Sequence, residues 1–454
     1  MAYFYALGCF VATATIEIYR DGEWLKAATI SVAGPSHLDS SRLQYDDDYA
    51  IARIQENTEK PAGLGCNYPV ELLIRDIASW PAFLLDILPS GAGRDHWVKR
   101  LGISDGHHAD LELLLHGAGS PPGNLRIREA VLARDPNMQA PGPDGVAVTM
   151  TDHPGFTLDE ICERQEHFIE YAYQNGAHTS GASDVAGVAP KFLMVLDEAG
   201  RWHAEGALPD AAIASSWLIK FPRGKTDSDR QVLRLEATYM KLAKAVGIRV
   251  HGELQWTRNT LLIPRFDRPR TTLGLQRIGM ESLLSLAEIC RYGGEAGGTP
   301  SHNVFLNALI AHVTDPQREV TEYLRRDSLN IALGNKDNHG RNTAVFRHQD
   351  GRVELTPLFD FAPMYLDPEG IARVSRWEGD QEKGGIPVWD KVIAAMPTMI
   401  NKKVLIAELN AFGHRLTMLP DIMAQEAVEP AVIAQRKHAI EREASALIDL
   451  KVIS

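Results

Sequence analysis

"GNKDNHGRNTAVF" (Gly334–Phe346) and "LTPLFDF" (Leu355–Phe361) are the two stretches that decide the fold of this chain. The first places a dense run of polar residues directly after "REVTEYLRRDSLNIAL", whose apolar residues recur at helical spacing. The second holds Asp360 inside an apolar run. Between them, "NTAVF" and "VELTPLF" read as strands and "QDG" as a turn. The pattern therefore predicts a helix, a polar loop, a hairpin and an aspartate at the end of that hairpin.

This order of elements suits phosphoryl transfer from ATP. One carboxylate must orient the attacking hydroxyl, while a second carboxylate and an amide hold Mg²⁺ against the phosphates. Asp337 and Asn342 have the D-x-x-x-x-N spacing that protein kinases use, and Asp360 follows the hairpin. We therefore predict that Asp337 is the catalytic base and that Asn342 and Asp360 bind the metal. Taken singly, each residue is also explained as a loop cap.

Two further segments carry cations suited to a nucleotide. Lys220 lies in the apolar strand pattern "WLIKF", where a buried lysine needs an anionic partner, and Glu236 follows on a predicted helix as the candidate. The alternative is an edge-strand lysine with its ammonium group in water. Upstream, the backbone of Gly187, Val188 and Ala189 precedes a strand and is able to cradle phosphate, with Lys191 adding charge. A simple turn is the alternative there.

Composition sets the wider limits. The chain has 454 residues, is 44% hydrophobic and carries a net charge of −12, which predicts an ordinary globular protein without a broad basic face for nucleic acid. Its four cysteines are far apart and form no C-x-x-C pair, which favours free thiols in a reducing cytoplasm. The apolar start lacks a basic region and reaches Glu17 and Arg20 early, so we expect a β-strand rather than a signal peptide.

The coarse organisation is a mixed, β-rich first half followed by a helical half. "TATIEIYRDGEWLKAATISV" predicts a hairpin at its Asp-Gly pair, and "RLQYDDDYAIARI" predicts a further strand. Residues 70–118 read as helical, and "DPNMQAPGPDG" reads as a linker. Short strand patterns return in residues 185–265, and helices dominate from about residue 300.

Several motifs, spread over most of the chain, resemble those of a known family. "SDVAGVAPK", "SWLIKFP", "LEATYMKLAKAVGI", "IPRFDR", "GNKDNHGRN" and "LTPLFDF" occur in the order and approximate spacing of the HipA-type serine/threonine kinases. These kinases are toxins of bacterial type II toxin–antitoxin systems. "FLLDILPSGAGRDHWVKRL" is also similar to their N-terminal region, so the resemblance covers most of the chain.

The resemblance implies an α+β, two-lobed protein-kinase-like fold. It places an N-terminal β/α subdomain in residues 1–150, a β-rich N-lobe in 151–275 and a helical C-lobe in 276–454. It implies ATP and Mg²⁺ as cofactors, with Lys191 and Lys220 at the phosphates and His339 beside the catalytic Asp337. Arg265 and Phe266 match the segment that joins the lobes beside the adenine.

The resemblance also implies a cytoplasmic enzyme that phosphorylates a protein, such as an aminoacyl-tRNA synthetase, to inhibit translation and growth. A helix-turn-helix antitoxin would be the partner and would carry the DNA contact. Asp184 stands where the family's autophosphorylated serine is expected, and Pro264 stands where a glutamate is expected. These departures keep open a second hypothesis, in which a catalytically weak protein acts as a binding partner or co-repressor. A metal-dependent hydrolase is a third, against which the lack of a compact two-metal ligand set counts.

Two further groups have alternative interpretations. His107, His108 and His116 are either a metal site or a surface turn followed by a helix-end histidine. Arg373, Arg376 and Trp377 follow Asp360 and either contact substrate or form a solvated basic loop.

Overall fold

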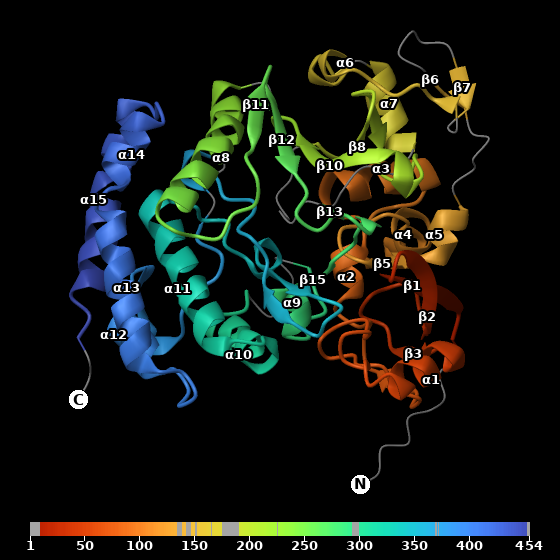
Figure 1. The fold of residues 1–454 in the computed structure, drawn as a ribbon, viewed down its shortest axis with the longest axis horizontal. Coiled ribbons are helices and arrows are strands. Elements are labelled where there is room, and N and C mark those ends of the chain that lie inside the picture. The colour runs from red at the N-terminus through yellow and green to blue at the C-terminus, as the bar shows by residue number, and fades with distance from the viewer. Residues whose placement is uncertain are drawn as a thin grey trace. The chain divides into compact units, whose positions relative to one another are not determined.

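A computed structural model describes residues 10–133, 139–141, 147–149, 152–164, 166–174, 190–224, 226–292, 299–367, 370 and 372–451. The chain divides into two compact units. Unit one comprises Met1–Lys220, Arg265–Glu295 and Phe346–Arg352, and unit two comprises Phe221–Pro264, Ala296–Val345 and Val353–Ser454. Both units contain helices and strands, which confirms the α+β class (Figure 1). The division at residues 150 and 275 stays a prediction.

Unit one begins with a five-stranded sheet. Its strand order is β4-β3-β2-β1-β5, with β1 at Ala12–Arg20, β2 at Glu23–Val32, β3 at Ser41–Tyr45, β4 at Arg75–Ile77 and β5 at Leu125–Ile127. Strands β1 and β2 pair antiparallel up to Arg20 and Glu23, which leaves a two-residue loop. Asp21 and Gly22 have φ angles of 54° and 92°, as a type I′ hairpin turn requires. The Asp-Gly hairpin and the strand near the N-terminus are thus confirmed.

Helices cover this sheet and complete its core. They are α1 (Asp47–Gln55), α2 (Leu84–Ile87), α3 (Gly91–Leu101), α4 (Asp110–Gly117) and α5 (Arg128–Leu132). Apolar side chains of the sheet and helices form one cluster, to which Ile16, Trp80 and Leu113 contribute.

The strand predicted over residues 42–54 is wrong in its second half. Asp46 caps α1 there by accepting from the Tyr49 amide, and two acidic residues follow in the first turn, where the helix dipole favours them.

A second group of strands in unit one carries the predicted nucleotide lysines. Strand β8 (Lys191–Asp197) pairs antiparallel with β10 (Ile213–Lys220) on one side and with β9 (Trp202–Ala204) on the other. This confirms the strands predicted in "KFLMVL" and "SSWLIKF". The smaller elements of this unit are β6 (Gln139–Pro141), β7 (Ala147–Thr149), α6 (Leu158–Cys162), α7 (Glu166–Gln174), β13 (Arg270–Thr271), β14 (Gly274–Leu275), β15 (Gly279–Ser282) and α9 (Leu283–Leu286).

Unit two is mainly helical, as predicted for the second half of the chain. Its helices are α8 (Asp227–Ala245), α10 (His302–His312), α11 (Pro316–Leu333), α12 (Trp389–Ala394), α13 (Lys402–Leu416), α14 (Leu419–Gln425) and α15 (Pro430–Ile448). Helix α15 packs along α13 and against α11 (Figure 1). Gly413 permits the close approach of α13 and α15, because a Cβ there would lie 2.9 Å from the Ala444 carbonyl oxygen.

Unit two also contains short strands, and one further strand, β16, begins in unit two and ends in unit one. Strands β11 (Gln255–Thr257) and β12 (Thr260–Pro264) form an antiparallel hairpin. Strand β16 (Ala344–Arg347) and strand β17 (Val353–Leu355) occupy the predicted hairpin after the polar loop, and β18 (Glu382–Lys383) pairs with β19 (Ile386–Pro387). Cys66, Cys162 and Cys290, the cysteines in the described ranges, are free thiols. Within the same ranges, no helix has the length and apolar content needed to cross a membrane.

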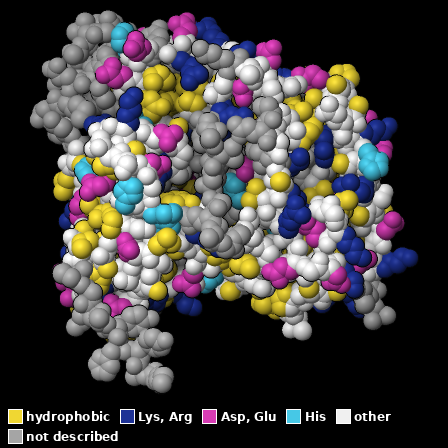
Figure 2. Space-filling model, turned by 180° about the vertical axis from the view of Figure 1, so that it is seen from behind, with side chains coloured by type: hydrophobic (Ala, Val, Ile, Leu, Met, Phe, Trp, Pro, Cys, Tyr) yellow, Lys and Arg dark blue, Asp and Glu magenta, His cyan; other side chains and the backbone are white. Residues whose placement is uncertain are grey.

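Charged side chains of both signs are mixed on the surface. Figure 2 shows lysine and arginine side chains interspersed with aspartate and glutamate over the face it presents.

Candidate active site

Helix α11 fixes the start of the polar loop. Its last residue is Leu333, and Gly334 follows in the left-handed conformation with φ 76°. A Cβ on Gly334 would lie 2.6 Å from the Tyr365 ring, so a larger residue is excluded by space as well as by backbone conformation. From α15, the Arg436 guanidinium donates to the carbonyl oxygens of Ile331 and Ala332. A cation at the carboxyl end of a helix satisfies unpaired carbonyls and complements the dipole, so the loop begins from a fixed point.

The loop folds back so that Asp337, His339 and Asn342 lie together. The Asn342 side-chain nitrogen donates to the Asp337 carbonyl oxygen at 2.8 Å, and the Asn342 amide donates to the His339 carbonyl oxygen at 3.0 Å. His339 Nε2 lies 3.3 Å from Asp337 Oδ1, and the two side chains are 13% and 14% exposed. The spacing of the D-x-x-x-x-N motif therefore has a structural reason: one turn of chain brings its two ends into contact.

His339 shows a feature expected beside a ligand. Both of its ring nitrogens are buried, and neither makes a hydrogen bond among the described residues. Buried polar atoms in native proteins are mostly hydrogen-bonded, so each exception calls for an explanation, and a catalytic role is one such explanation. A hydroxyl group brought to Asp337 would supply a partner for this imidazole.

Asp360 adopts a backbone conformation that is uncommon for a residue with a side chain. Its φ is 52°, whereas its neighbour Phe361 is buried and packs against Tyr239 with ring centroids 5.5 Å apart. The buried Phe361 anchors the segment directly after this left-handed residue. Such strain is retained where the surrounding structure imposes it, and it is frequent at functional sites.

The hairpin brings the chain of Asp360 back towards that of Asn342. The Thr356 amide donates to the Ala344 carbonyl oxygen at 2.9 Å. Asn342 precedes this pair by two residues and Asp360 follows it by four, so both leave from the same end of the hairpin. Because the Asn342 nitrogen is committed to Asp337, its Oδ1 is the atom suited to a metal, alongside the Asp360 carboxylate. Oxygen ligands of this kind suit Mg²⁺, so the residues fit the ion that the motif implies. That they share one ion stays a prediction.

In unit one, the predicted phosphate lysines are paired across a strand ladder. Lys191 and Lys220 are Cα partners at the ends of β8 and β10, so their side chains lie on the same face. Lys220 is only 4% exposed. Their contact with phosphate stays a prediction. The strand register that places the two lysines opposite each other could not be read from the sequence.

Three other predicted nucleotide contacts are placed but not tested. Glu236 lies in α8 of unit two and is 3% exposed; its pairing with Lys220 stays a prediction. Arg265 is buried in unit one, where its guanidinium binds Asp267 at 2.7 Å and Glu205 at 3.0 Å. Its side chain is thus committed to an ion network. Phe266 packs edge-on against Phe346, with ring centroids 5.6 Å apart.

The loop predicted to cradle phosphate lies outside the described residues. This holds for Gly187, Val188 and Ala189 and also for Asp184, the residue that stands in the place of the regulatory serine. Their assignments stay predictions.

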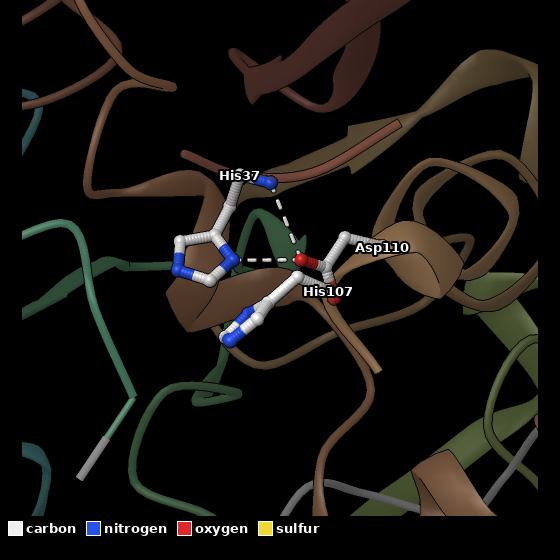
Figure 3. A group of neighbouring side chains, drawn as sticks. All are labelled: His37, His107 and Asp110. Atoms are coloured by element: carbon white, nitrogen blue, oxygen red, sulfur yellow. Dashed lines mark hydrogen bonds and ion pairs between the residues drawn. The ribbon is translucent and has the colours of Figure 1, made fainter. Parts of the chain in front are cut away.

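The histidines of residues 107–116 do not gather into one site. His108 Nε2 lies 2.8 Å from Ser104 Oγ, and His116 Nδ1 lies 2.9 Å from the Glu112 carbonyl oxygen. His107 instead lies near His37 and Asp110, and the possible ligand atoms of these three residues are within 4.8 Å of one another (Figure 3). This is the spacing of a metal site, although the sequence did not indicate His37.

The hydrogen bonds of Asp110 favour a structural network over a metal at that position. Oδ2 accepts from the His37 amide at 3.2 Å and from His37 Nδ1 at 2.7 Å, as Figure 3 shows. Oδ1 lies 2.8 Å from Arg94 Nη1 and 3.2 Å from the Tyr292 hydroxyl. Burial raises the pKa of Asp110, but these donors together hold it below its ordinary value. A carboxylate that is already neutralised by a guanidinium and accepts four hydrogen bonds is a poor ligand for a further cation.

Sequence analysis did not identify Asp327, and it did not assign Arg373 and Trp377 a role in supporting the Asp337 loop. Asp327, in the middle of α11, is 2% exposed and accepts two hydrogen bonds from Arg373. Trp377 is also buried. Arg373 and Trp377 therefore form neither a solvated loop nor, by their side chains, a substrate contact. Asp327 follows Val320 and Tyr323 at helical spacing, so it lies on the apolar face of the helix. A charged residue on that face was the sequence signal for a buried ion pair.

Comparisons with known proteins identify the family of this chain. The HipA-like C-terminal domain family matches residues 183–412. The serine/threonine-protein kinase toxin HipA of Shewanella oneidensis is 24% identical over 308 residues, which cover 63% of this chain and 64% of that protein, just under two thirds of its length. Y4mE of Sinorhizobium fredii, whose name describes it as a kinase only provisionally, is 25% identical over 340 residues, or 73% of this chain and 70% of that protein.

A solved structure of HipA from Shewanella oneidensis, in complex with HipB and its operator DNA, is similar over 96% of this chain and 100% of that chain. The TM-score is 0.61 at 18% identity, so the likeness shows a shared kinase-like fold. The family match, by contrast, rests on the sequence itself and spans just over half of the chain. On that ground the chain belongs to the HipA-type kinase family.

Proposed function

We propose that this chain is an ATP- and Mg²⁺-dependent serine/threonine protein kinase. The observation that carries the proposal is the closed loop in unit two, in which Asn342 binds the Asp337 backbone and His339 lies against the Asp337 carboxylate. This arrangement presents one carboxylate for an acceptor hydroxyl and one amide oxygen for a metal. Family membership supports the same function.

Each residue then has a role in the transfer. The Asp337 carboxylate accepts a hydrogen bond from the substrate hydroxyl and takes its proton as the oxygen attacks phosphorus. Asn342 Oδ1 and the Asp360 carboxylate would hold Mg²⁺, and Lys191 and Lys220 would neutralise phosphate oxygens. Bound MgATP supplies the γ-phosphoryl group: the new bond joins the substrate oxygen to phosphorus, and the bond to the β-phosphate oxygen breaks to release ADP.

The experiment is phosphoryl transfer to proteins of a bacterial lysate with labelled ATP and Mg²⁺. Wild type is compared with Asp337→Asn and with Asp350→Asn, a matched control in the exposed turn of the neighbouring hairpin. Loss of a general base lowers the rate by about 10²- to 10⁴-fold, so Asp337→Asn should label almost nothing while the control labels normally. Equal labelling by wild type and Asp337→Asn would show that the catalytic assignment is wrong.

We propose the substrate class and the partner from the family. The substrate is a cytosolic protein, for which an aminoacyl-tRNA synthetase is the first candidate, and its phosphorylation would inhibit translation. The similar HipA structure was solved with HipB and operator DNA, and we propose that this chain likewise binds a helix-turn-helix antitoxin. The net charge of −12 supports a protein that leaves DNA to such a partner.

Asp184 and Pro264 keep open one alternative function, a catalytically weak co-repressor. Nucleotide titration separates the two. A kinase binds MgATP at cellular concentrations and loses this binding when EDTA removes the metal. A co-repressor without activity would bind the antitoxin and shift operator DNA equally well with and without MgATP.

A further inference from the structure

A buried polar cluster lies beneath the Asp337 loop in unit two. We call it the Asp327 cluster, and its members are Asp327, His302, Asn338, Arg373 and Trp377. At its centre, Arg373 Nη2 donates to both carboxylate oxygens of Asp327 at 2.8 Å, and Trp377 Nε1 donates to Oδ2 at 2.9 Å. Burial raises the pKa of Asp327. The charge of Arg373 and the other donors lower it by more than that, so the pKa lies below its ordinary value. Asp327 is therefore a fixed negative charge to which the segment 373–377 is attached.

His302 joins this charge pair to the loop. Its Nε2 lies 3.1 Å from Asn338 Nδ2 and 3.1 Å from Arg373 Nη2. Both neighbours carry N–H groups that can donate to Nε2, and Nδ1 lies 2.7 Å from the Tyr323 hydroxyl. Burial lowers the pKa of His302 to about 4, although Asp327 acts in the opposite direction. His302 is thus a neutral ring with one orientation, because each nitrogen has a different task.

Asn338 is held from two sides, and it stands between Asp337 and His339. Its Oδ1 accepts from the Ser375 amide at 3.2 Å, and its Nδ2 is 3.4 Å from the Ser375 carbonyl oxygen. One residue before Ser375, the Val374 amide donates to the carbonyl oxygen of Lys336, two residues before Asn338, at 3.2 Å. The segment that Asp327 fixes therefore runs along the loop and contacts the residues on either side of Asp337.

We propose that Arg373 is a positioning residue that sets the orientation of Asp337 through the Asp327 cluster. Arg373 bonds to Asp327 and His302 within the cluster and, through Nη1 at 2.8 Å, to Glu382 outside it. Asp327 lies ten residues before Asp337 and Arg373 lies thirty-six after it, so the cluster joins the chain on both sides of the catalytic loop. This inference rests on the proposed role of Asp337 and adds a residue that touches neither substrate nor nucleotide.

A lysine would not substitute for this arginine. The planar guanidinium presents several donors in fixed directions, whereas an ammonium group cannot bind both oxygens of Asp327 and reach Glu382 and His302. Arg376 offers a matched comparison within the same segment. Its side chain is 59% exposed and lies 3.9 Å from Glu382.

The experiment combines hydrogen exchange with kinetics on the full-length protein. The variants are Arg373→Lys, Arg376→Lys as control, and the double variant Asp327→Asn with Arg373→Gln. The double variant serves if the single one fails to fold, because it removes both charges of the Asp327–Arg373 pair, while Glu382 keeps Arg376 at 3.9 Å. We expect amide exchange in peptides covering 335–343 to accelerate at least about tenfold in the Arg373 variants, while peptides from α13 and α15 keep wild-type rates.

The kinetic readout separates positioning from general damage. Misplacement of a reacting group by about 1 Å costs on the order of 100-fold in rate, so kcat should fall by up to that factor while KM for ATP changes little. Wild-type exchange across 335–343 in both Arg373 variants, or the same acceleration in Arg376→Lys, would overturn the inference. A wild-type protein that transfers no phosphate would refute the proposed function alone, because the exchange measurement would still decide whether Arg373 orders the loop.

Discussion

Replacing Glu443 with glutamine should stabilise this protein above pH 7 and have little effect near pH 5. Glu443 lies in α15, fully buried, where Oε2 accepts from Trp389 Nε1 at 3.2 Å. Burial raises its pKa to about 7 from the ordinary 4.5, although Trp389 and the nearby Arg442 lower it in part. Asp327 adds to the rise and Arg373 opposes it.

The sign follows from proton binding. The folded state binds the Glu443 proton more tightly than the unfolded state does, so its contribution to stability is fully present below pH 4.5. The contribution is lost as the pH rises through about 7. One pKa unit corresponds to about 1.4 kcal/mol, so a rise from 4.5 to about 7 bounds the loss at about 3 kcal/mol. Glutamine has nearly the same shape, retains an oxygen for Trp389 and carries no charge at any pH.

The assay is urea unfolding of wild type, Glu443→Gln and Glu441→Gln at several pH values between 5 and 8.5. Glu441 is an exposed residue of the same helix and serves as the control. At each pH, the free energy of unfolding of wild type is subtracted from that of the variant, so that the titration of all other groups cancels. We expect Glu443→Gln to exceed wild type by about 1–3 kcal/mol at pH 8.5 and to approach it at pH 5. A difference that does not change with pH, or one shared by Glu441→Gln, would refute the reasoning.

Two further predictions concern a buried charge and a strained backbone. Asp267→Ala should cost about 3–5 kcal/mol in urea unfolding, since it leaves the buried Arg265 and Arg268 without the carboxylate each contacts at 2.7 Å. The partly exposed Asp210→Ala should cost clearly less, and equal losses would contradict this. Asp360→Gly should be about 1 kcal/mol more stable than Asp360→Ala, because φ at this position is 52°. Both Asp360 variants should lose Mg²⁺-dependent nucleotide binding, measured by titration calorimetry; metal dependence retained in either would remove Asp360 from the metal site.

Several features of this protein are determined locally and could be predicted from the sequence. The Asp21-Gly22 turn, the end of α11 at Gly334 and the contact between Asp337 and Asn342 each depend on residues within a few positions of one another. Such features follow from backbone conformations that specific residue types favour, and those preferences are encoded in short stretches. The strand prediction for residues 46–54 failed for the same kind of reason, since a capping aspartate outweighed the apolar alternation there.

The motif order was a second source of information available without a structure. It identified the family, and with it the α+β, kinase-like fold that the similar structure shows. The pairing of Glu236 with Lys220 and the phosphate loop at Gly187 were inferred from the residues themselves, and both stay predictions.

Only the tertiary structure decided what lies around these motifs. Lys191 and Lys220 are opposite each other because β8 and β10 pair in one particular register. Arg265 and Arg373 read as site or surface cations in the sequence, yet both are buried in ion pairs. The partners of Arg373 come from residues 302, 327 and 382, and no local pattern specifies such a combination. A buried charge is stable only when distant segments supply its counter-charge and hydrogen bonds, so its place is settled by packing and not by sequence spacing.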